Sequence, residues 1–154
     1  MNSTAIILAY IGVALMVGLA GCASAIGTSI CGQAAVGAMK KNKNAFGSYM
    51  VLAALPGSQG LYGFVCFFMV NNIFGLINDN TTILQGAAVL GIGALVGVVN
   101  LAASVYQGRV CANGIVSVGN GHDVMGNTLI LAAFPELYAI LTVAATFMIG
   151  SAVA

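Results

Sequence analysis

Apolar residues fill four long blocks of the chain, at roughly 5–38, 46–77, 83–112 and 126–153. A membrane-spanning helix needs about 20 mostly apolar residues, and every block is long enough to supply them. A β-barrel would instead show short segments in which apolar and polar residues alternate between turns. The pattern therefore predicts an all-α membrane protein with four transmembrane helices. The first two blocks exceed the usual span, so we expect some helices to project into water.

Polar segments separate the blocks and indicate the topology: KKNK at 40–43, NDNTT at 78–82 and NGIVSVGNGHD at 113–123. Lys and Arg mark the cytoplasmic side of a membrane. The lysines of the first segment share a side with Arg109, whereas Asp79 lies opposite. We therefore expect the first and third connections in the cytoplasm and both termini on the other side, although three lysines also suit any solvated loop. The opening MNSTAIILAY lacks the basic start of a secretory signal, so we take it as part of the first helix.

Composition excludes the other broad classes of protein. Charged residues make up 5% of the chain and hydrophobic residues 60%, and the mean hydropathy is +1.06. A soluble domain needs charges on about a quarter to a third of its surface, which four basic and three acidic side chains cannot provide. The hydrophobicity excludes intrinsic disorder, and a net charge of only +1 argues against a nucleic-acid binder.

Glycine is concentrated in the first and third blocks, whereas the second and fourth carry larger residues such as Phe64, Phe68, Phe134 and Tyr138. Glycine destabilises a helix, and in membranes its abundance is explained by close approach of helix backbones. We therefore expect the first and third helices to form a tightly packed inner layer, with the second and fourth outside. A generic bundle with small-residue contacts would explain the glycines but not their segregation. The glycines concerned are Gly12, Gly18, Gly21, Gly27, Gly32, Gly37, Gly86, Gly91, Gly93, Gly97 and Gly108.

The two halves of the chain resemble each other. LAALPGSQGLYG at 52–63 and LAAFPELYA at 131–139 share Leu-Ala-Ala, a bulky residue, Pro and then Leu-Tyr. A repeat of roughly 75–80 residues, each a helical hairpin of the same orientation, is the simplest description. The sequence thus predicts a single membrane domain with a first hairpin at 5–77 and a second at 83–153.

Glu136 is the only ionisable acid within an apolar block. A carboxylate in the middle of a membrane costs several kcal/mol unless it is protonated, paired or coordinated, and such residues are functional by default. The alternative is a protonated glutamate that only bridges two helices. The matching polar residue of the first half is Gln59, which cannot carry a proton. Pro56 and Pro135 come shortly before these residues and free backbone carbonyls about one turn earlier, near Leu52 and Leu131.

These motifs resemble a known family. LPGSQGLYG at 55–63, PELYAIL around Glu136 and YQGRV around Gln107 are similar to the K subunit (the c subunit, or proteolipid) of V-type rotary ATPases, and most similar to the bacterial sodium-pumping branch. The resemblance covers essentially the whole chain. It implies a homo-oligomeric rotor ring of identical subunits, driven by cytoplasmic ATPase domains through a central-stalk subunit at the cytoplasmic loops. It also implies a non-catalytic subunit that carries an ion on Glu136 past a stator subunit, which supplies an arginine.

The polar residues around Glu136 bear on which ion is carried. A proton needs one carboxylate, whereas a hard cation such as Na⁺ needs several oxygens to replace its water. Gln59, Gln107 and Ser58 offer side-chain oxygens, and a carbonyl near Pro56 offers another. The oxygen count favours Na⁺ over H⁺. In the other interpretation, the two glutamines only bridge helices by hydrogen bonds, and the ion is a proton.

The resemblance also implies a role for each of these residues. The ligands of Na⁺ would be the Leu55 backbone carbonyl, the Ser58 hydroxyl, the two glutamines Gln59 and Gln107, and Glu136. Tyr62 would hydrogen-bond the glutamate and hold the site closed. The chain departs from the sodium-binding pattern at Ser58, where threonine is more frequent. Serine keeps the oxygen but lacks the methyl group that restricts the rotamer, so a lower affinity is expected.

A rival hypothesis is a stand-alone ion channel or transporter in which Glu136 is the gating carboxylate. A hydrated pore needs a polar lining from several helices, and the first and third blocks contain too few polar residues for one. The remaining chemistry-bearing residues suggest no cofactor. No phosphate-loop motif occurs, and the cysteines lie inside apolar blocks without a C-x-x-C pair, as buried small apolar residues do. These are Cys22, Cys31, Cys66 and Cys111; His122 and Asp123 are expected to be solvated loop residues.

Overall fold

The computed structural model describes residues 3–154, and these residues form helices and their connections, with no strand among them. Four helical segments are long and apolar enough to cross a membrane. The chain is therefore a multi-pass membrane protein, and the predicted all-α fold is confirmed. The elements in order are α1 (Ser3–Met39), η1 (Lys43–Ala45), α2 (Phe46–Ala54), η2 (Leu55–Gly57), α3 (Ser58–Phe68), η3 (Met69–Ile73), α4 (Ile83–Gly119) and α5 (Met125–Val153).

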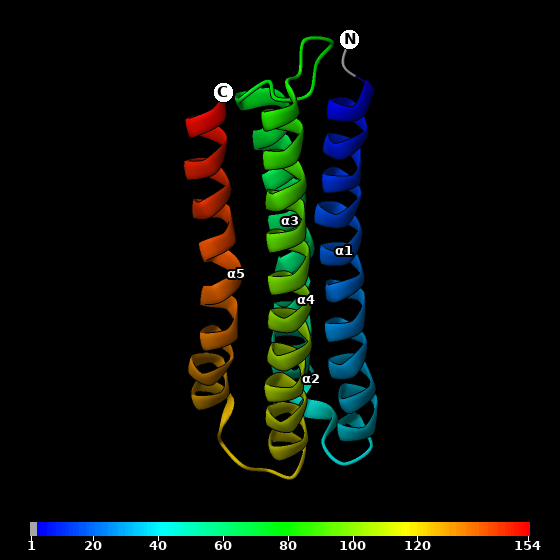
Figure 1. Cartoon of the computed structure of the whole chain (residues 1–154). Helices are drawn as coiled ribbons and strands as arrows, with labels where there is room; N and C mark the ends of the chain where they lie inside the picture. The colour runs from blue at the N-terminus through cyan, green and yellow to red at the C-terminus, as the bar shows by residue number, and fades with distance from the viewer. Residues whose placement is uncertain (1–2) are drawn as a thin grey trace.

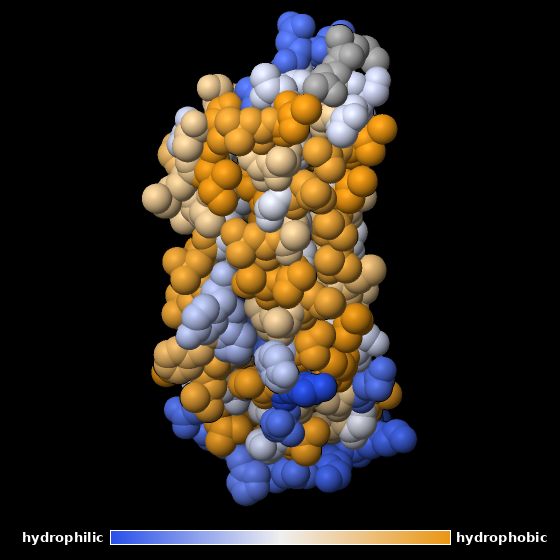
Figure 2. All heavy atoms as spheres, viewed as in Figure 1, coloured by the Kyte–Doolittle hydropathy of each residue, from blue (hydrophilic) through white to orange (hydrophobic). Residues whose placement is uncertain are grey.

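The helices form an elongated bundle of two hairpins (Figure 1). The first hairpin pairs α1 with the continuous path from η1 to η3, and the second pairs α4 with α5. The α1–α2 and α4–α5 connections lie at one end of the bundle, and the α3–α4 connection lies at the other end with the C-terminus. Hydrophobic residues cover most of the visible side, whereas hydrophilic residues gather at the two ends (Figure 2). This distribution is what a bilayer requires.

Helices α1 and α4 run side by side with their backbones in contact. A Cβ added to Gly93 would overlap the Gly12 carbonyl, and one added to Gly108 would lie 2.8 Å from the carbonyl oxygen of Gly27. Only glycine allows helices to approach this closely. The expectation that glycine permits close packing between the first and third helices is therefore confirmed.

Other glycines of the same helices do not serve this contact. A Cβ at any of them would meet nothing within 4 Å, so they lie on open faces of the chain. The packing of α1 against α4 therefore explains only part of the glycine content of the odd-numbered spans. The open glycines on these helices are Gly18, Gly21, Gly32, Gly37 and Gly91.

Helix α4 ends later than predicted, at Gly119 rather than near residue 112. The polar residues beyond 112 suggest a connection, but the apolar residues among them continue the packed face of the helix. Ile115 is fully buried, and Gly119 packs beside Ala38 of α1. Burial of this face outweighs the low helix propensity of the asparagine and glycines in the segment.

The second span ends earlier than predicted, at Ile73 rather than near residue 77. The chain leaves the helix at Gly75, whose φ of +59° is readily adopted only by glycine. Leu76 then folds back into the core, where it is fully buried, and its N–H donates to the Val70 carbonyl. The apolar residues after Ile73 therefore belong to the core without being helical.

A break in the second span separates α2 from α3. The turn η2 contains Pro56, which has no N–H to donate to a carbonyl one turn earlier and whose ring crowds that carbonyl. The chain tightens to a short 3₁₀ turn and then resumes as α3 at Ser58. This break lies directly before Ser58 and Gln59, two of the residues singled out from the sequence.

Candidate ion-binding site

Glu136 lies on α5, half-buried, and both of its carboxylate oxygens accept hydrogen bonds from other helices. The Tyr62 hydroxyl of α3 donates to Oε1 over 2.7 Å. The Gln107 side-chain amide of α4 donates to Oε2 over 3.0 Å. Side chains of three helices thus meet at the single carboxylate of the apolar blocks. Both partners are neutral, so the carboxylate still needs a proton or a cation to be stable in a membrane.

The two glutamines form the buried side of this cluster. Gln59 Nε2 donates to Gln107 Oε1 over 2.8 Å, and Gln107 Nε2 also donates to the Ala132 carbonyl over 3.0 Å. Neither glutamine side chain is exposed. Gln59 Oε1 is buried and has no hydrogen-bond partner. An unpartnered buried acceptor costs about 1–3 kcal/mol, so a ligand that binds this oxygen would be stabilised.

Leu55 and Ser58 supply further oxygens at the break between α2 and α3. The Ser58 hydroxyl donates to the Leu55 carbonyl over 3.0 Å. Both residues line a surface groove of about 670 Å³, and Glu136 lines it from α5. The groove connects the carboxylate to the surface of the bundle. Glu136 is therefore open to the surface of the bundle and not sealed in the core.

These atoms form a donor set suited to a hard cation. Helix α5 offers a carboxylate, α3 offers an amide oxygen without a partner and a hydroxyl, and the turn η2 offers a main-chain carbonyl. Oxygen ligands of this kind replace the water of hard cations. The lone pairs left on Gln107 Oε1 and on the Ser58 hydroxyl add capacity, because each atom has two lone pairs. The residues present therefore fit Na⁺ as well as a proton.

The structure brings three of the residues predicted to form the site to Glu136 and places the other two in the adjoining groove. Tyr62, Gln107 and Gln59 form a continuous hydrogen-bonded chain with Glu136. Ser58 and Leu55 do not bond to that chain; they bond to each other and share the groove with Glu136. Next to Leu131, the carbonyl of Ala132 accepts a hydrogen bond from Gln107. No metal-binding cluster of three or more His, Cys, Asp or Glu residues occurs within residues 3–154.

The sequence pattern assigns no role to two serines of the neighbouring helices. Ser24 of α1 and Ser104 of α4 both hydrogen-bond to the break that carries the site. Their only signal in the sequence is that they are polar residues inside apolar helices. Their partners become visible only when the helices are packed.

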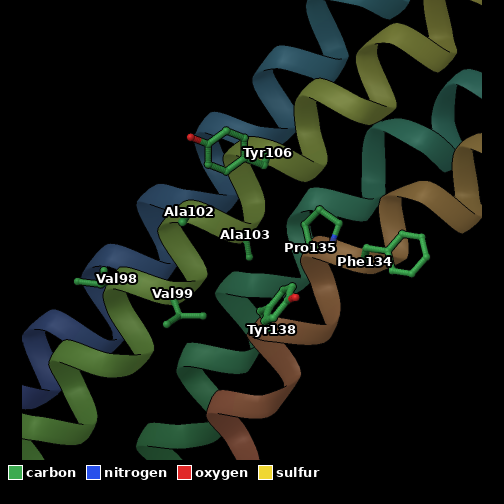
Figure 3. Close-up of a pocket in the computed structure, with 8 residues that line it drawn as sticks. All are labelled: Val98, Val99, Ala102, Ala103, Tyr106, Phe134, Pro135 and Tyr138. Atoms are coloured by element: carbon green, nitrogen blue, oxygen red, sulfur yellow. The ribbon is translucent and has the colours of Figure 1, made fainter.

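A second hollow, between α4 and α5, is apolar and separate from the carboxylate (Figure 3). It has a volume of about 520 Å³. Its walls are aliphatic and aromatic, with the rings of Tyr106 and Tyr138 at its sides. The residues shown are Val98, Val99, Ala102, Ala103, Tyr106, Phe134, Pro135 and Tyr138. This set offers no carboxylate or amide for an ion.

The other polar candidates lie away from the site. Arg109 is exposed and its guanidinium stands 5.3 Å from the centre of the Tyr106 ring, a cation–π contact. His122 and Asp123 are exposed in the α4–α5 connection. The four cysteines are free: Cys22 is exposed, whereas Cys31, Cys66 and Cys111 are buried.

Comparison with known proteins gives two matches to one family. The family of ATP synthase C subunits matches residues 11–70 and again residues 90–149, one segment in each hairpin. This double match agrees with the internal repeat. It also confirms the resemblance identified from the motifs around Gln59, Gln107 and Glu136, and the expectation of a non-catalytic subunit.

Individual relatives extend over most of the chain. The chain is 31% identical over 147 residues to the A-type ATP synthase subunit K of Methanocaldococcus jannaschii, and this match covers 94% of the chain. It is 33% identical over 129 residues to the V-type sodium ATPase subunit K of Enterococcus hirae, and this match covers 84% of the chain. The matches span 63% of the length of the first relative and 81% of the second.

Proposed function

Because the chain belongs to the family of ATP synthase C subunits, we propose that it is the rotor-ring subunit of a V/A-type rotary ATPase and that it carries Na⁺ on Glu136. Identical copies form the ring. A stator subunit faces it in the membrane, and a central-stalk subunit binds its loops. The α1–α2 and α4–α5 connections face the cytoplasm, because the lysines lie in the first of them.

One observation carries the choice of ion. Gln59 Oε1 is a buried oxygen without a partner beside the Glu136 network, and a proton on Glu136 would not satisfy it. A cation bound between this oxygen, the carboxylate and the oxygens of Ser58 and Leu55 would satisfy all of them. The relative from Enterococcus hirae is named a sodium ATPase subunit, which points the same way.

The mechanism follows from the cost of a bare carboxylate in lipid. Glu136 keeps its ion while its copy faces lipid, because the uncompensated charge there costs several kcal/mol. Beside the arginine of the stator the negative charge is compensated, so the ion leaves. Tyr62 and Gln107 hold the two carboxylate oxygens in place throughout. The chain's own residues thus bind, orient and release the ion, and ATP chemistry takes place on other subunits.

A hydrophobic carbodiimide tests this proposal directly, since it reacts with a protonated carboxyl group within the membrane. Na⁺ should slow the modification of Glu136 in the purified ring, as measured by the mass of the subunit. The Glu136→Gln variant should assemble into a ring and show neither modification nor ion transport. Retained ion-coupled ATPase activity in that variant would overturn the role of Glu136. Modification that responds to pH but not to Na⁺ would change the ion to H⁺.

A further inference from the structure

The break between α2 and α3 is held by hydrogen bonds from two other helices. On one side, the Ser24 hydroxyl of α1 donates to the Gly57 carbonyl over 3.0 Å and accepts from the Gly60 N–H over 2.7 Å. On the other side, the Ser104 hydroxyl of α4 lies 2.8 Å from the Pro56 carbonyl and 2.8 Å from the Ala23 carbonyl of α1, and it donates its single proton to one of them at a time. The position of the short 3₁₀ turn therefore depends on its contacts with α1 and α4.

Ser24 supplies what the interrupted helix lacks. The first N–H groups of a helix have no partner within it, and a serine hydroxyl placed just before the helix ordinarily accepts from one of them. Here the hydroxyl comes from α1, and it bonds the N–H of Gly60 near the start of α3. The same oxygen donates to the carbonyl of Gly57. One side chain thus links the backbone on both sides of the break.

The two bonded residues enclose two candidate ligands. Gly57 directly precedes Ser58, and Gly60 directly follows Gln59. Ser24 therefore fixes the backbone of the dipeptide that carries the hydroxyl and the unpartnered amide oxygen. Gly60 allows the approach, because a Cβ there would lie 3.1 Å from the Ser24 hydroxyl oxygen.

We propose that Ser24 is a positioning residue of the ion site, which holds Ser58 and Gln59 in the geometry that binds Na⁺ and so sets the affinity for Na⁺ relative to H⁺. This inference rests on the proposed function. Ser24 bonds to backbone groups and not to the ion ligands themselves. Its effect is selective for the cation, because protonation of Glu136 does not use the oxygens of Ser58 or Gln59.

Ser24→Ala tests this role. The Na⁺ concentration that halves the rate of carbodiimide modification of Glu136 should rise about tenfold in the purified ring, the effect of one lost hydrogen bond of about 1.4 kcal/mol. The pH dependence of the modification without Na⁺ should stay as in the wild type. A merely structural loss would also alter the Na⁺-free reaction, so the two measurements separate positioning from general damage.

Two further variants complete the test. Ser24→Thr keeps the hydroxyl. The Na⁺ concentration that halves the modification rate (the half-protection concentration) should therefore lie within about twofold of the wild-type value, a difference of about 0.4 kcal/mol. Ser29→Ala is the matched control, because the exposed Ser29 hydroxyl of the same helix bonds to the Gln33 side chain and not to the break. It should leave half-protection unchanged.

The outcomes distinguish this inference from the proposed function. If Na⁺ does not protect Glu136 in the wild type, the sodium site itself is wrong and the inference falls with it. If Na⁺ protects the wild type and protects Ser24→Ala equally well, only the role of Ser24 is overturned. If the alanine variant does not assemble, Ser24→Cys replaces it, because a thiol is only a weak donor and acceptor. The same rise in the half-protection concentration is expected. Sodium protection equal to that of the wild type would overturn the inference.

Discussion

Gln59 gives its amide N–H to Gln107 over 2.8 Å, while its own amide oxygen stays buried without a partner. This arrangement gives the two glutamines different tasks. Gln107 orients the network, because its amide bonds both Glu136 and the Ala132 carbonyl. Gln59 presents a free oxygen. The expected effects of substitutions at the site depend on this division and on the packing around it.

Replacing Gln107 by leucine should raise the Na⁺ concentration that halves the modification of Glu136 by about ten- to a hundredfold. The substitution removes an oxygen and the hydrogen bond to the carboxylate, a loss of about 1.4–2.8 kcal/mol. Protonation of Glu136 should remain possible, so modification without Na⁺ should continue. The measurement is the Na⁺ dependence of carbodiimide modification. Gln33→Leu, on α1, is the control, since Gln33 bonds only to Ser29 of its own helix.

Tyr62→Phe should speed exchange of the bound ion and leave the set of ligands intact. The Tyr62 hydroxyl donates to Glu136 Oε1 over 2.7 Å, so the variant loses only the bond that holds the carboxylate in place. Exchange of radioactive sodium on the purified ring measures the rate. Tyr138→Phe, on the exposed side of α5, should exchange at the wild-type rate. An unchanged rate in Tyr62→Phe would show that Tyr62 does not hold the site closed.

Protection by a fixed concentration of Na⁺ should strengthen as the pH rises. The ionised carboxylate is the form that binds a cation, so protons and Na⁺ compete for Glu136. Lowering the pH favours the protonated form and releases Na⁺; raising it does the reverse. Half-protection concentrations measured at several pH values should therefore fall as the pH increases. A half-protection concentration that does not vary with pH would contradict competition at one carboxylate.

Gly93→Ala should destabilise the bundle by about 1–3 kcal/mol, the typical cost of overpacking. Its new methyl group would overlap the Gly12 carbonyl of α1. Gly91→Ala, two residues away on the same helix, meets nothing within 4 Å and should be neutral or stabilising by up to about 1 kcal/mol. Thermal unfolding of dissociated single chains in detergent, followed by circular dichroism, compares the two variants. Equal losses in both would contradict the backbone contact between α1 and α4.

The features that depend on local chemistry could be predicted from the sequence. Four spans followed from the length of the apolar blocks, and Glu136 followed from the cost of a carboxylate in a membrane. The ends of the second and third spans could not be predicted in this way. Tertiary packing buries both Ile115, which lies in the added turns of α4, and Leu76, which lies after the end of the second span. Hydropathy alone does not show which neighbours bury a residue, so it does not show where these helices end.

The candidate site also has features that the sequence predicts and features that only the packed structure reveals. The sequence singled out the side chains that could bind an ion, and the structure brings them into one hydrogen-bonded cluster and its adjoining groove. The supporting bonds of Ser24 and Ser104 needed the packed helices, because each joins positions more than thirty residues apart. Binding of Na⁺ by the cluster stays a prediction.

The contact between α1 and α4 has a mechanical consequence. Where Gly12 and Gly27 meet the opposite backbone, no deformable layer of side chains separates the two helices. We expect such a pair to resist sliding and to act as one strut, because any shift would bring the two backbones into collision. Gln107 and Ser104 connect this strut to Glu136 and to the break at Pro56. A sideways force on the carboxylate would therefore reach the paired backbones of α1 and α4 through the hydrogen bond of Gln107.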